Sequence, residues 1–267
     1  MARRGSTPIL YHGGLNGPSL AVLAALEASG LEIERRHIRL IYGERHTLPG
    51  LESSIALDFA VEGEGPVLVI DGEAMSESVF LAQYIDEAAG GCGLQPDDAF
   101  TRWQMRMWCR QVTERLAPAS AYLGNLAWSQ KQKFGGMTPE ERADMLAPIR
   151  SVDLRERWQE LLDGVVDDAK VADSRAKVAQ FAARIDDQLA DGREWLIGEF
   201  SIADLETFAW LWPMRCLEHD AFQGRTRCTE WLDRVYARPC VAAVIDRADD
   251  GDPITIFAPG PEINRWG

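Results

Sequence analysis

Short apolar runs separated by polar turns mark the first third of the chain. Two further stretches, residues 20–29 and 76–89, place their apolar residues at helical spacing instead. Asp71-Gly72 is a typical two-residue hairpin turn between two of the apolar runs. The runs that predict strands are residues 9–11, 33–41, 67–70 and 74–75. The order strand, helix, strand, loop, strand, strand, helix predicts an α/β domain with a mixed four-stranded sheet.

Strand patterns end after residue 98, and helical patterns follow. Residues 90–98 contain three glycines and a proline, which is typical of a linker. Beyond it, apolar residues recur at i, i+3, i+4 and i+7 in residues 105–116, 178–189 and 205–216. Thr138 and Glu141 stand at capping-box spacing around Pro139, so the charged segment after them is also predicted to be helical. We therefore predict two domains, residues 1–90 and an all-helical domain of residues 99–267.

Composition narrows the classes of partner. The chain has 267 residues, 46% of them hydrophobic, which is enough for packed cores. Its formal net charge of -14 repels nucleic acid and anionic lipid, so we expect neither as a partner. No apolar run approaches the roughly 18 residues of a membrane span, and residues 1–8 lack the apolar core of a signal peptide. We expect a cytoplasmic protein.

The five cysteines are scattered along the chain. They form no CxxC pair and no zinc-ligand spacing: Cys92, Cys109, Cys216, Cys228 and Cys240. This spacing is typical of free, mostly buried thiols in a reducing compartment. We expect no metal site.

One segment carries a specific resemblance. Ser201 and Asp204 form a short capping box at the start of an apolar helix, after Trp195-Leu196-Ile197-Gly198 and before the segment at residues 231–239. Together these segments closely resemble the core helix and closing segment of glutathione S-transferases. The resemblance implies a thioredoxin-like first domain, a helical second domain, and glutathione as co-substrate.

The same resemblance implies a glutathione site in the first domain. Gly65 and Pro66 match the family segment whose proline is cis and whose preceding backbone pairs with the cysteinyl group. Glu77 and Ser78 would hold the ammonium and carboxylate of the γ-glutamyl group at a helix N-terminus, although simple helix capping explains them too. Arg45 or His46 could pair with the glycyl carboxylate; a solvated turn is an equal alternative.

Three residues are candidates for the group that activates the thiol. A free thiol has a pKa of about 8.5, so the protein must stabilise the glutathione thiolate with a donor. The resemblance to serine-type members favours Ser19, which lies at the start of the first helix. Asn16 is the second candidate and Tyr11 the third. A capping or first-turn role for Ser19 is equally compatible with the pattern.

A branch of the superfamily is indicated by residues 94–108 and Glu114, with the aromatic continuation Tyr122 and Trp128. These resemble the bacterial β-aryl-etherases, which use glutathione to open lignin-derived aryl ethers. The resemblance implies thiolate attack on the carbon β to a ketone and release of a phenolate. Trp108, Tyr122 and Trp128 could line an aromatic pocket, but helically spaced aromatics also form cores.

The chain also departs from the family pattern. The Asn-Pro expected before the third strand is missing, and glycine replaces valine before Pro66. Asp58, Glu62 and Glu64 place three carboxylates in this loop, which should weaken binding of anionic glutathione. Three hypotheses follow: an active etherase, a catalytically degenerate subunit that stabilises a heterodimeric etherase, or a transferase-fold binding module. We expect a dimer, with a heterodimer favoured over a homodimer if the glutathione site is defective.

Overall fold

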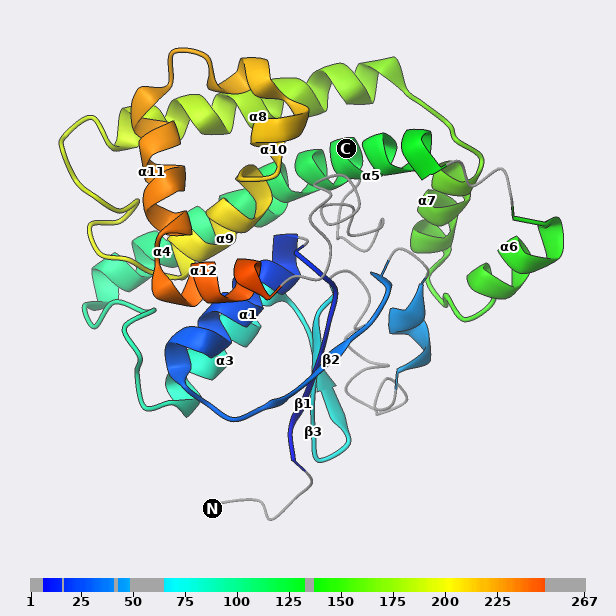
Figure 1. The fold of residues 1–267 in the computed structure, drawn as a ribbon, viewed down its shortest axis with the longest axis horizontal. Coiled ribbons are helices and arrows are strands. Elements are labelled where there is room, and N and C mark those ends of the chain that lie inside the picture. Colours follow the sequence, from blue (N-terminus) through cyan, green and yellow to red (C-terminus); the bar gives the residue numbers. More distant parts are fainter. Residues whose placement is uncertain (1–6, 16, 41–42, 49–64, 133–136, 248–267) are drawn as a thin grey trace.

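The computed structural model describes residues 7–15, 17–40, 43–48, 65–132 and 137–247 of the chain. Its four strands form one mixed sheet with the order β2-β1-β3-β4. The strands are β1 (Ile9–His12), β2 (Glu34–His37), β3 (Val67–Ile70) and β4 (Glu73–Met75). β1 pairs with β2 in parallel and with β3 in antiparallel, and β3 pairs with β4 in antiparallel. This confirms the predicted sheet (Figure 1).

The second strand is shorter than predicted. β2 covers four residues of the nine expected, and all four are exposed. Among the described strands it lies at the edge of the sheet, with a strand partner on one side of its backbone only. Its Glu-Arg-Arg-His sequence keeps charge on that edge, which discourages pairing with other chains. Ile38 and Leu40 follow it and are buried, although neither belongs to the strand.

Two helices cover one face of the sheet. α1 (Gly17–Ser29) is apolar almost throughout and is buried from Gly17 to Leu26. It packs against α3 (Ser78–Ala88) and also against α9 and α12 of the helical part. Gly30 ends α1 in the left-handed region, with φ of 66°, as a C-cap glycine does. Asp71 and Gly72 both have positive φ, which confirms the predicted hairpin turn.

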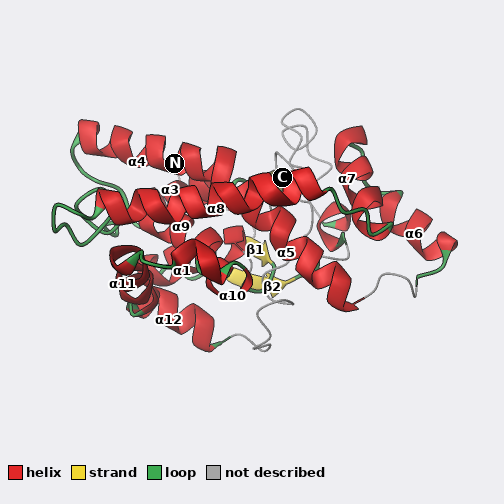
Figure 2. Cartoon of the chain, turned by 90° about the horizontal axis from the view of Figure 1, so that it is seen from above, coloured by secondary structure: helices red, strands yellow, loops and turns green. Residues whose placement is uncertain are grey.

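The remaining described elements are helical. They are α4 (Ala99–Gln111), the π-helical turn η3 (Val112–Leu116), α5 (Ala117–Gln132), α6 (Pro139–Leu146), α7 (Val152–Leu162), α8 (Asp168–Gln188), α9 (Ile202–Leu211), α10 (Met214–Leu217), α11 (Thr226–Tyr236) and α12 (Pro239–Asp246), with short 3₁₀ turns η2 (Glu44–Thr47) and η5 (His219–Phe222). In both views α6 and α7 lie together at the end of the molecule opposite α11 (Figure 2). The predicted α/β plus all-α architecture is confirmed.

The helical pattern predicted for residues 205–216 is interrupted. α9 ends at Leu211, and Pro213 stands in the turn before α10. Proline lacks an N–H and clashes with the preceding turn, so the helix cannot continue through it. Consequently Cys216 is exposed, whereas Leu205, Phe208 and Ala209 are buried.

Both predicted capping boxes are present. At α6, the Thr138 side chain accepts from the Glu141 amide, and Glu141 accepts from the Thr138 amide at 2.7 Å. At α9, Ser201 and Asp204 form the same reciprocal arrangement in a fully buried position. The Asp204 carboxylate also accepts from the Leu196 amide at 3.1 Å and from the Trp231 indole at 2.9 Å. It therefore joins the start of α9 to the preceding loop and to α11.

One hydrophobic core runs through both parts of the molecule. It contains Leu10 of β1, Leu68 of β3 and the buried face of α1, and it continues to Trp231 of α11. A separate cluster is formed by Trp158 and other apolar residues of α7 together with Trp128 and Ile149. The α/β and helical parts thus share apolar packing, while the boundary at residues 90–98 stays a prediction.

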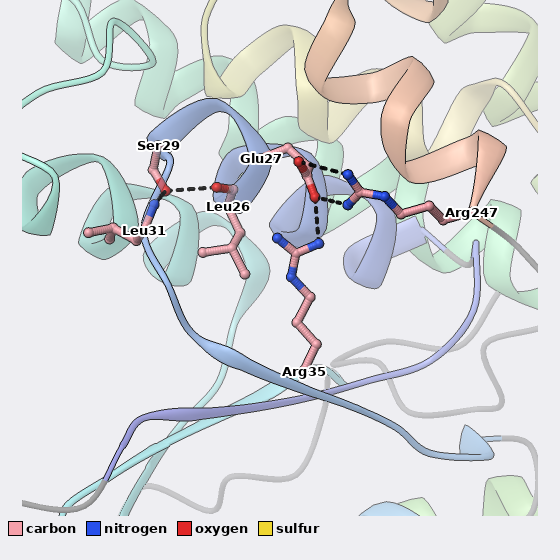
Figure 3. Close-up of polar contacts among 6 residues, drawn as sticks. All are labelled: Leu26, Glu27, Ser29, Leu31, Arg35 and Arg247. Atoms are coloured by element: carbon pink, nitrogen blue, oxygen red, sulfur yellow. Dashed lines mark hydrogen bonds and ion pairs between the residues drawn. The ribbon is translucent and has the colours of Figure 1, made fainter.

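An ion-pair cluster links α1, β2 and the C-terminal end of the described residues. Glu27 of α1 receives hydrogen bonds from Arg35, which lies in β2, and from Arg247, which follows α12 (Figure 3). The side chain of Glu27 is 17% exposed. Burial by itself would raise its pKa, but the two guanidinium groups outweigh burial and hold the pKa below its ordinary value of 4.5. The cluster therefore stabilises the packing of α12 on α1.

Candidate functional site

A cavity of about 630 Å³ opens at the N-terminus of α3. Its walls come from the first turns of α3, from α4 and from the π-helical turn η3. The residues that line it are Glu77, Ser78, Val79, Phe80, Gln83, Arg106, Cys109, Arg110, Thr113 and Glu114. A helix N-terminus presents unpaired N–H groups and a partial positive charge, so this cavity suits a ligand with an anionic group.

Glu77 adopts a strained backbone conformation directly before α3. Its φ is 72° and its ψ 103°, a region that residues other than glycine rarely occupy. Its side chain does not cap the helix, so the capping alternative does not describe this residue. Strained residues of this kind cluster at ligand-binding sites, because the strain holds a functional group in place.

Ser78 is the first residue of α3 and is almost fully buried. Its hydroxyl donates to the Oε1 atom of Glu206 in α9, at 3.0 Å. The indole Nε1 of Trp210 donates to the same oxygen, also at 3.0 Å. Glu206 has no exposed surface. A buried carboxylate therefore lies directly behind the end of the cavity formed by Ser78.

Charged groups on α4 and η3 form the opposite wall. Arg110 pairs with Glu114 at 2.7 Å. Within the described part of the chain, Arg106 forms no ion pair, and its guanidinium is available to an anionic ligand. Cys109 also lines the cavity, but burial, followed by the charges of Glu206 and Asp204, raises its pKa well above 9.0. Its thiol is therefore neutral and a poor nucleophile.

The π-helical turn η3 contributes Thr113 and Glu114 to the cavity wall. The Thr113 hydroxyl donates to the Cys109 carbonyl at 3.1 Å, within the stretch where the helix widens. Such turns occur mostly as single insertions in α-helices and are frequent at functional sites. The apolar spacing at residues 105–116 predicted the helix but contained no signal for this widening.

The peptide bond between Gly65 and Pro66 is cis, as the resemblance implied. Gly65 is buried, and a β-carbon at this position would lie 2.6 Å from Cδ2 of Leu40. Because Leu40 is itself 2% exposed, it has little room to move. The replacement of valine by glycine before this proline is therefore matched by the Leu40 side chain. The backbone contact of Gly65 and Pro66 with glutathione stays a proposal.

Ser19 lies in the first turn of α1 and has no exposed surface. Its Oγ accepts from the Gly13 amide at 2.9 Å, which closes the turn between β1 and α1. Tyr11 is buried in β1, and its hydroxyl accepts from Arg36 at 3.3 Å. Asn16 lies outside the described residues. Neither Ser19 nor Tyr11 lines the cavity described above.

The two candidates for the glycyl carboxylate lie in η2. Arg45 is completely buried, whereas His46 next to it is partly exposed. Gly43 precedes this turn with φ of 70°. Neither side chain lines the described cavity. The acidic loop residues Asp58, Glu62 and Glu64 lie outside the described residues.

The three aromatic candidates for a substrate pocket are all buried. The Trp108 indole donates to Thr207 at 2.9 Å and carries the Arg184 guanidinium over its ring at 4.6 Å. The Tyr122 hydroxyl accepts from the Asp167 amide at 3.3 Å. Trp128 packs in the cluster that includes Trp158 of α7. Since none of them lines the cavity, these placements suit the core alternative.

No group of three or more potential metal ligands comes together among the residues that the structure describes. Within the same ranges, no helix combines the length and the apolar composition needed to cross a bilayer.

Comparison with known proteins shows which proteins this chain resembles. No family model matches the chain. Protein LigF of Sphingobium sp. (strain NBRC 103272 / SYK-6) is 27% identical over 256 residues, which cover 91% of this chain and 95% of LigF. The crystal structure of β-etherase LigF from Sphingobium sp. strain SYK-6 matches with a TM-score of 0.76 at 24% identity, over 91% of this chain and 100% of that chain.

Two glutathione transferases share the fold at greater distance. Glutathione transferase F7 from Populus trichocarpa matches with a TM-score of 0.63 at 19% identity, over 90% of this chain and 98% of that chain. A glutathione transferase from Burkholderia graminis, solved with two glutathione molecules per subunit, matches with a TM-score of 0.61 at 20% identity, over 94% of this chain and 92% of that chain. The chain thus has the fold of the glutathione S-transferases. In sequence and in fold it is similar to the β-etherase LigF.

Sequence reasoning missed several residues of the cavity. Arg106 and Glu114 stood only in the motif that indicated the branch, and Glu206 was not singled out. Glu206 carries a detectable signal, because a carboxylate inside a predominantly apolar helix must find buried partners. The identity of those partners, in α3 and in α9 itself, needed the three-dimensional structure.

Proposed function

We propose that the chain is a glutathione-dependent enzyme that cleaves β-aryl ether bonds in lignin-derived aromatic compounds. The observation that carries this proposal is the cavity at the α3 N-terminus, in a chain similar to a β-etherase over 91% of its length. Its acceptors and donors match the zwitterionic γ-glutamyl end of glutathione: Glu77 and Ser78 on one side, main-chain N–H groups and Arg106 on the other.

In the proposed reaction, the glutathione thiolate attacks the side-chain β-carbon, which bears the aryloxy group and is bonded directly to the ketone carbon. A C–S bond forms while the C–O bond breaks, and the phenolate leaves with the bonding electron pair. The protein has to lower the thiol pKa from about 8.5 and to stabilise the leaving phenolate. The N-terminus of α1 supplies a favourable field for the thiolate, and Ser19 is the proposed hydroxyl donor.

The buried position of Ser19 favours a second candidate function. A hydroxyl with no exposed surface must move before it can reach a thiolate. A chain in which it does not move would be the degenerate, stabilising subunit of a heterodimeric etherase. In that case the chain contributes the fold and the interface, and a homologous subunit carries the reaction.

One assay separates these functions. The purified chain is incubated with glutathione and a β-aryl ether ketone, and the released phenol is measured. The active-enzyme proposal expects phenol that depends on both the chain and glutathione. Phenol release only after addition of a homologous subunit would support the stabilising role. Glutathione binding without phenol release in either mixture would support a binding module.

We also propose that the chain forms a homodimer through the outer surfaces of α3 and α4. Four large aromatic side chains are exposed there: Phe80, Tyr84, Phe100 and Trp103. Phe100 and Trp103 stack on each other with centroids 5.7 Å apart, and Phe80 also lines the cavity. α4 carries three arginines and no carboxylate, so the overall charge of -14 is not concentrated on this surface. A second copy is therefore a suitable partner.

A further inference from the structure

A second, smaller cavity lies between η3 and α8, which pack against each other in the helical part. Its volume is about 90 Å³, against about 630 Å³ for the cavity at α3. One wall is a stripe along α8 at i, i+3, i+4 and i+7, and Arg115 of η3 also lines the cavity. The stripe consists of Lys177, Gln180, Phe181 and Arg184. A space of this size suits a small ligand or the end of a larger one, not a whole tripeptide.

The lining of this cavity is basic, although the chain is acidic overall. It includes two arginines and a lysine but no carboxylate, in a chain with 42 acidic and 28 basic residues. Lys177 forms an ion pair with Asp173 at 2.6 Å. Within the described ranges, neither Arg115 nor Arg184 forms an ion pair. These two guanidinium groups are therefore the uncompensated charges of the cavity.

Arg184 is held in place by an aromatic ring. Its guanidinium lies 4.6 Å from the centroid of the Trp108 ring. That ring is itself fixed, because its Nε1 atom donates to the Thr207 hydroxyl at 2.9 Å. Stacking uses the face of a guanidinium, so the N–H donors along its edge remain available to an acceptor.

Arg115 and Arg184 also repel each other. Burial, and then the charge of Arg115, hold the pKa of Arg184 below its ordinary value. An anion that accepts from both groups would replace this repulsion with two attractions. Guanidinium groups are weakly hydrated and match the oxygens of phosphate in a bidentate manner, which makes an oxyanion the suitable ligand.

We propose that this cavity binds a tetrahedral dianion, either inorganic phosphate or sulfate or the terminal group of a phosphate ester. Arg115 and Arg184 donate to its oxygens and match its two negative charges, while Lys177 and Gln180 supply further N–H donors. The inference is independent of the proposed reaction, because this cavity shares no lining residue with the cavity at α3.

The test titrates inorganic phosphate into the full-length chain by isothermal titration calorimetry. It is done at about pH 8, where phosphate is mostly a dianion, and at constant ionic strength. The wild type should bind one phosphate per chain. Arg115→Gln and Arg184→Gln should each weaken binding by about tenfold, because each removes a charged hydrogen-bond donor. Arg115→Lys should lose less affinity, since it keeps the charge.

Two control variants locate the binding. Arg175→Gln makes the same change in net charge on the same helix, at a residue that pairs with Glu218, and it should keep the wild-type affinity. Arg106→Gln removes the arginine of the cavity at α3 and should also keep it. In phosphate-free buffer, Arg115→Gln should not lower the thermal midpoint, because it relieves the repulsion of Arg184. Loss of phosphate binding in this variant is then not a loss of folding.

Glycerol 3-phosphate distinguishes the source of the anion. Affinity equal to that of inorganic phosphate would support the end group of an ester, and binding of inorganic phosphate alone would support the free ion. A wild type that binds no phosphate would overturn the inference. So would binding that is lost in Arg106→Gln but kept in Arg115→Gln, or an effect of Arg175→Gln as large as that of Arg115→Gln.

Discussion

The indole ring of Trp210 occupies the space that a β-carbon on Gly17 would fill. Such a carbon would lie 2.5–2.6 Å from three ring atoms, which is closer than β-carbons approach other atoms in folded proteins. Trp210 also donates to Glu206, and Glu206 accepts from Ser78. The first turn of α1 is thereby linked through α9 to the first turn of α3.

Gly17→Ala should destabilise the protein by about 1–3 kcal/mol, because overpacking forces a buried side chain out of its position. The measurement is the free energy of unfolding by chemical denaturation. Gly14→Ala is the matched control, since Gly14 is exposed, has no atom within 4 Å of an added β-carbon, and should be nearly neutral. Equal effects of the two substitutions would contradict the contact as the cause.

Glu77→Gly should separate stability from binding. Glycine tolerates the φ of 72°, so the free energy of unfolding should increase by about 1 kcal/mol as the strain is relieved. At the same time, loss of the carboxylate should weaken glutathione binding by about tenfold. Thermal denaturation and calorimetry measure the two effects. A variant that gained stability and kept full affinity would show that the strain does not serve ligand binding.

Asp204→Asn should reveal an unusual dependence of stability on pH. Burial raises the pKa of Asp204 to about 6, although hydrogen bonds from Trp231, Leu196 and Ser201 oppose it. Between about pH 4 and 6 the folded protein thus keeps a proton that the unfolded chain has lost, so this group's contribution to stability decreases as pH rises. In the asparagine variant, the side-chain NH₂ group would face one of these N–H donors, and neither group can accept a hydrogen bond. This variant should therefore be less stable than the wild type by about 1–3 kcal/mol at about pH 4.

The stability gap between wild type and Asp204→Asn should therefore narrow as pH rises from about 4 to about 6. Urea denaturation of both proteins at several pH values measures it. Carboxylates with lowered pKa values, such as Glu27, act in the opposite direction, but they are common to both proteins and cancel in the difference. A gap that widened over this range would mean that ionised Asp204 is stabilised in the folded state.

Glu27→Gln should loosen the packing of α12 on α1. The variant loses ion pairs with both Arg35 and Arg247, and at neutral pH it should be destabilised by about 1 kcal/mol. Glu27 has a lowered pKa, so its stabilising effect is present above pH 4.5 and is lost as pH falls below that value. Glu34→Gln is the control, because Glu34 forms a single, largely exposed pair with Arg36. A similar loss in both variants would argue against the cluster.

Trp103→Glu should convert the proposed homodimer into a monomer. The side chain is 55% exposed in the described subunit, and a buried, unpaired charge at an interface is strongly unfavourable. Light scattering coupled to size-exclusion chromatography measures the mass. Val165→Glu places the same charge at an exposed apolar residue outside the aromatic surface, and this variant should stay dimeric. A wild type that is monomeric at all concentrations would refute the assembly proposal.

Local features were predictable from the sequence because they depend on neighbours within about four residues. The helical spacing at residues 178–189, the turn at Asp71-Gly72 and the capping box of Thr138 and Glu141 all have this property, and all are confirmed. The resemblance added the cis bond before Pro66, which local pattern alone does not specify. Where sequence reasoning failed locally, as at the end of α9, a proline had been overlooked.

By itself, then, the sequence determined the fold class, the succession of most helices and strands, and the helix starts. Only the tertiary structure decided what lies around the candidate site. Ser78 and Glu206 are 128 residues apart, and no spacing rule connects them. Likewise Gly17 meets Trp210, and Gly65 meets Leu40, through the packing of separate elements. Close packing makes each such contact specific, and it forms only when distant segments are brought together by the shared core.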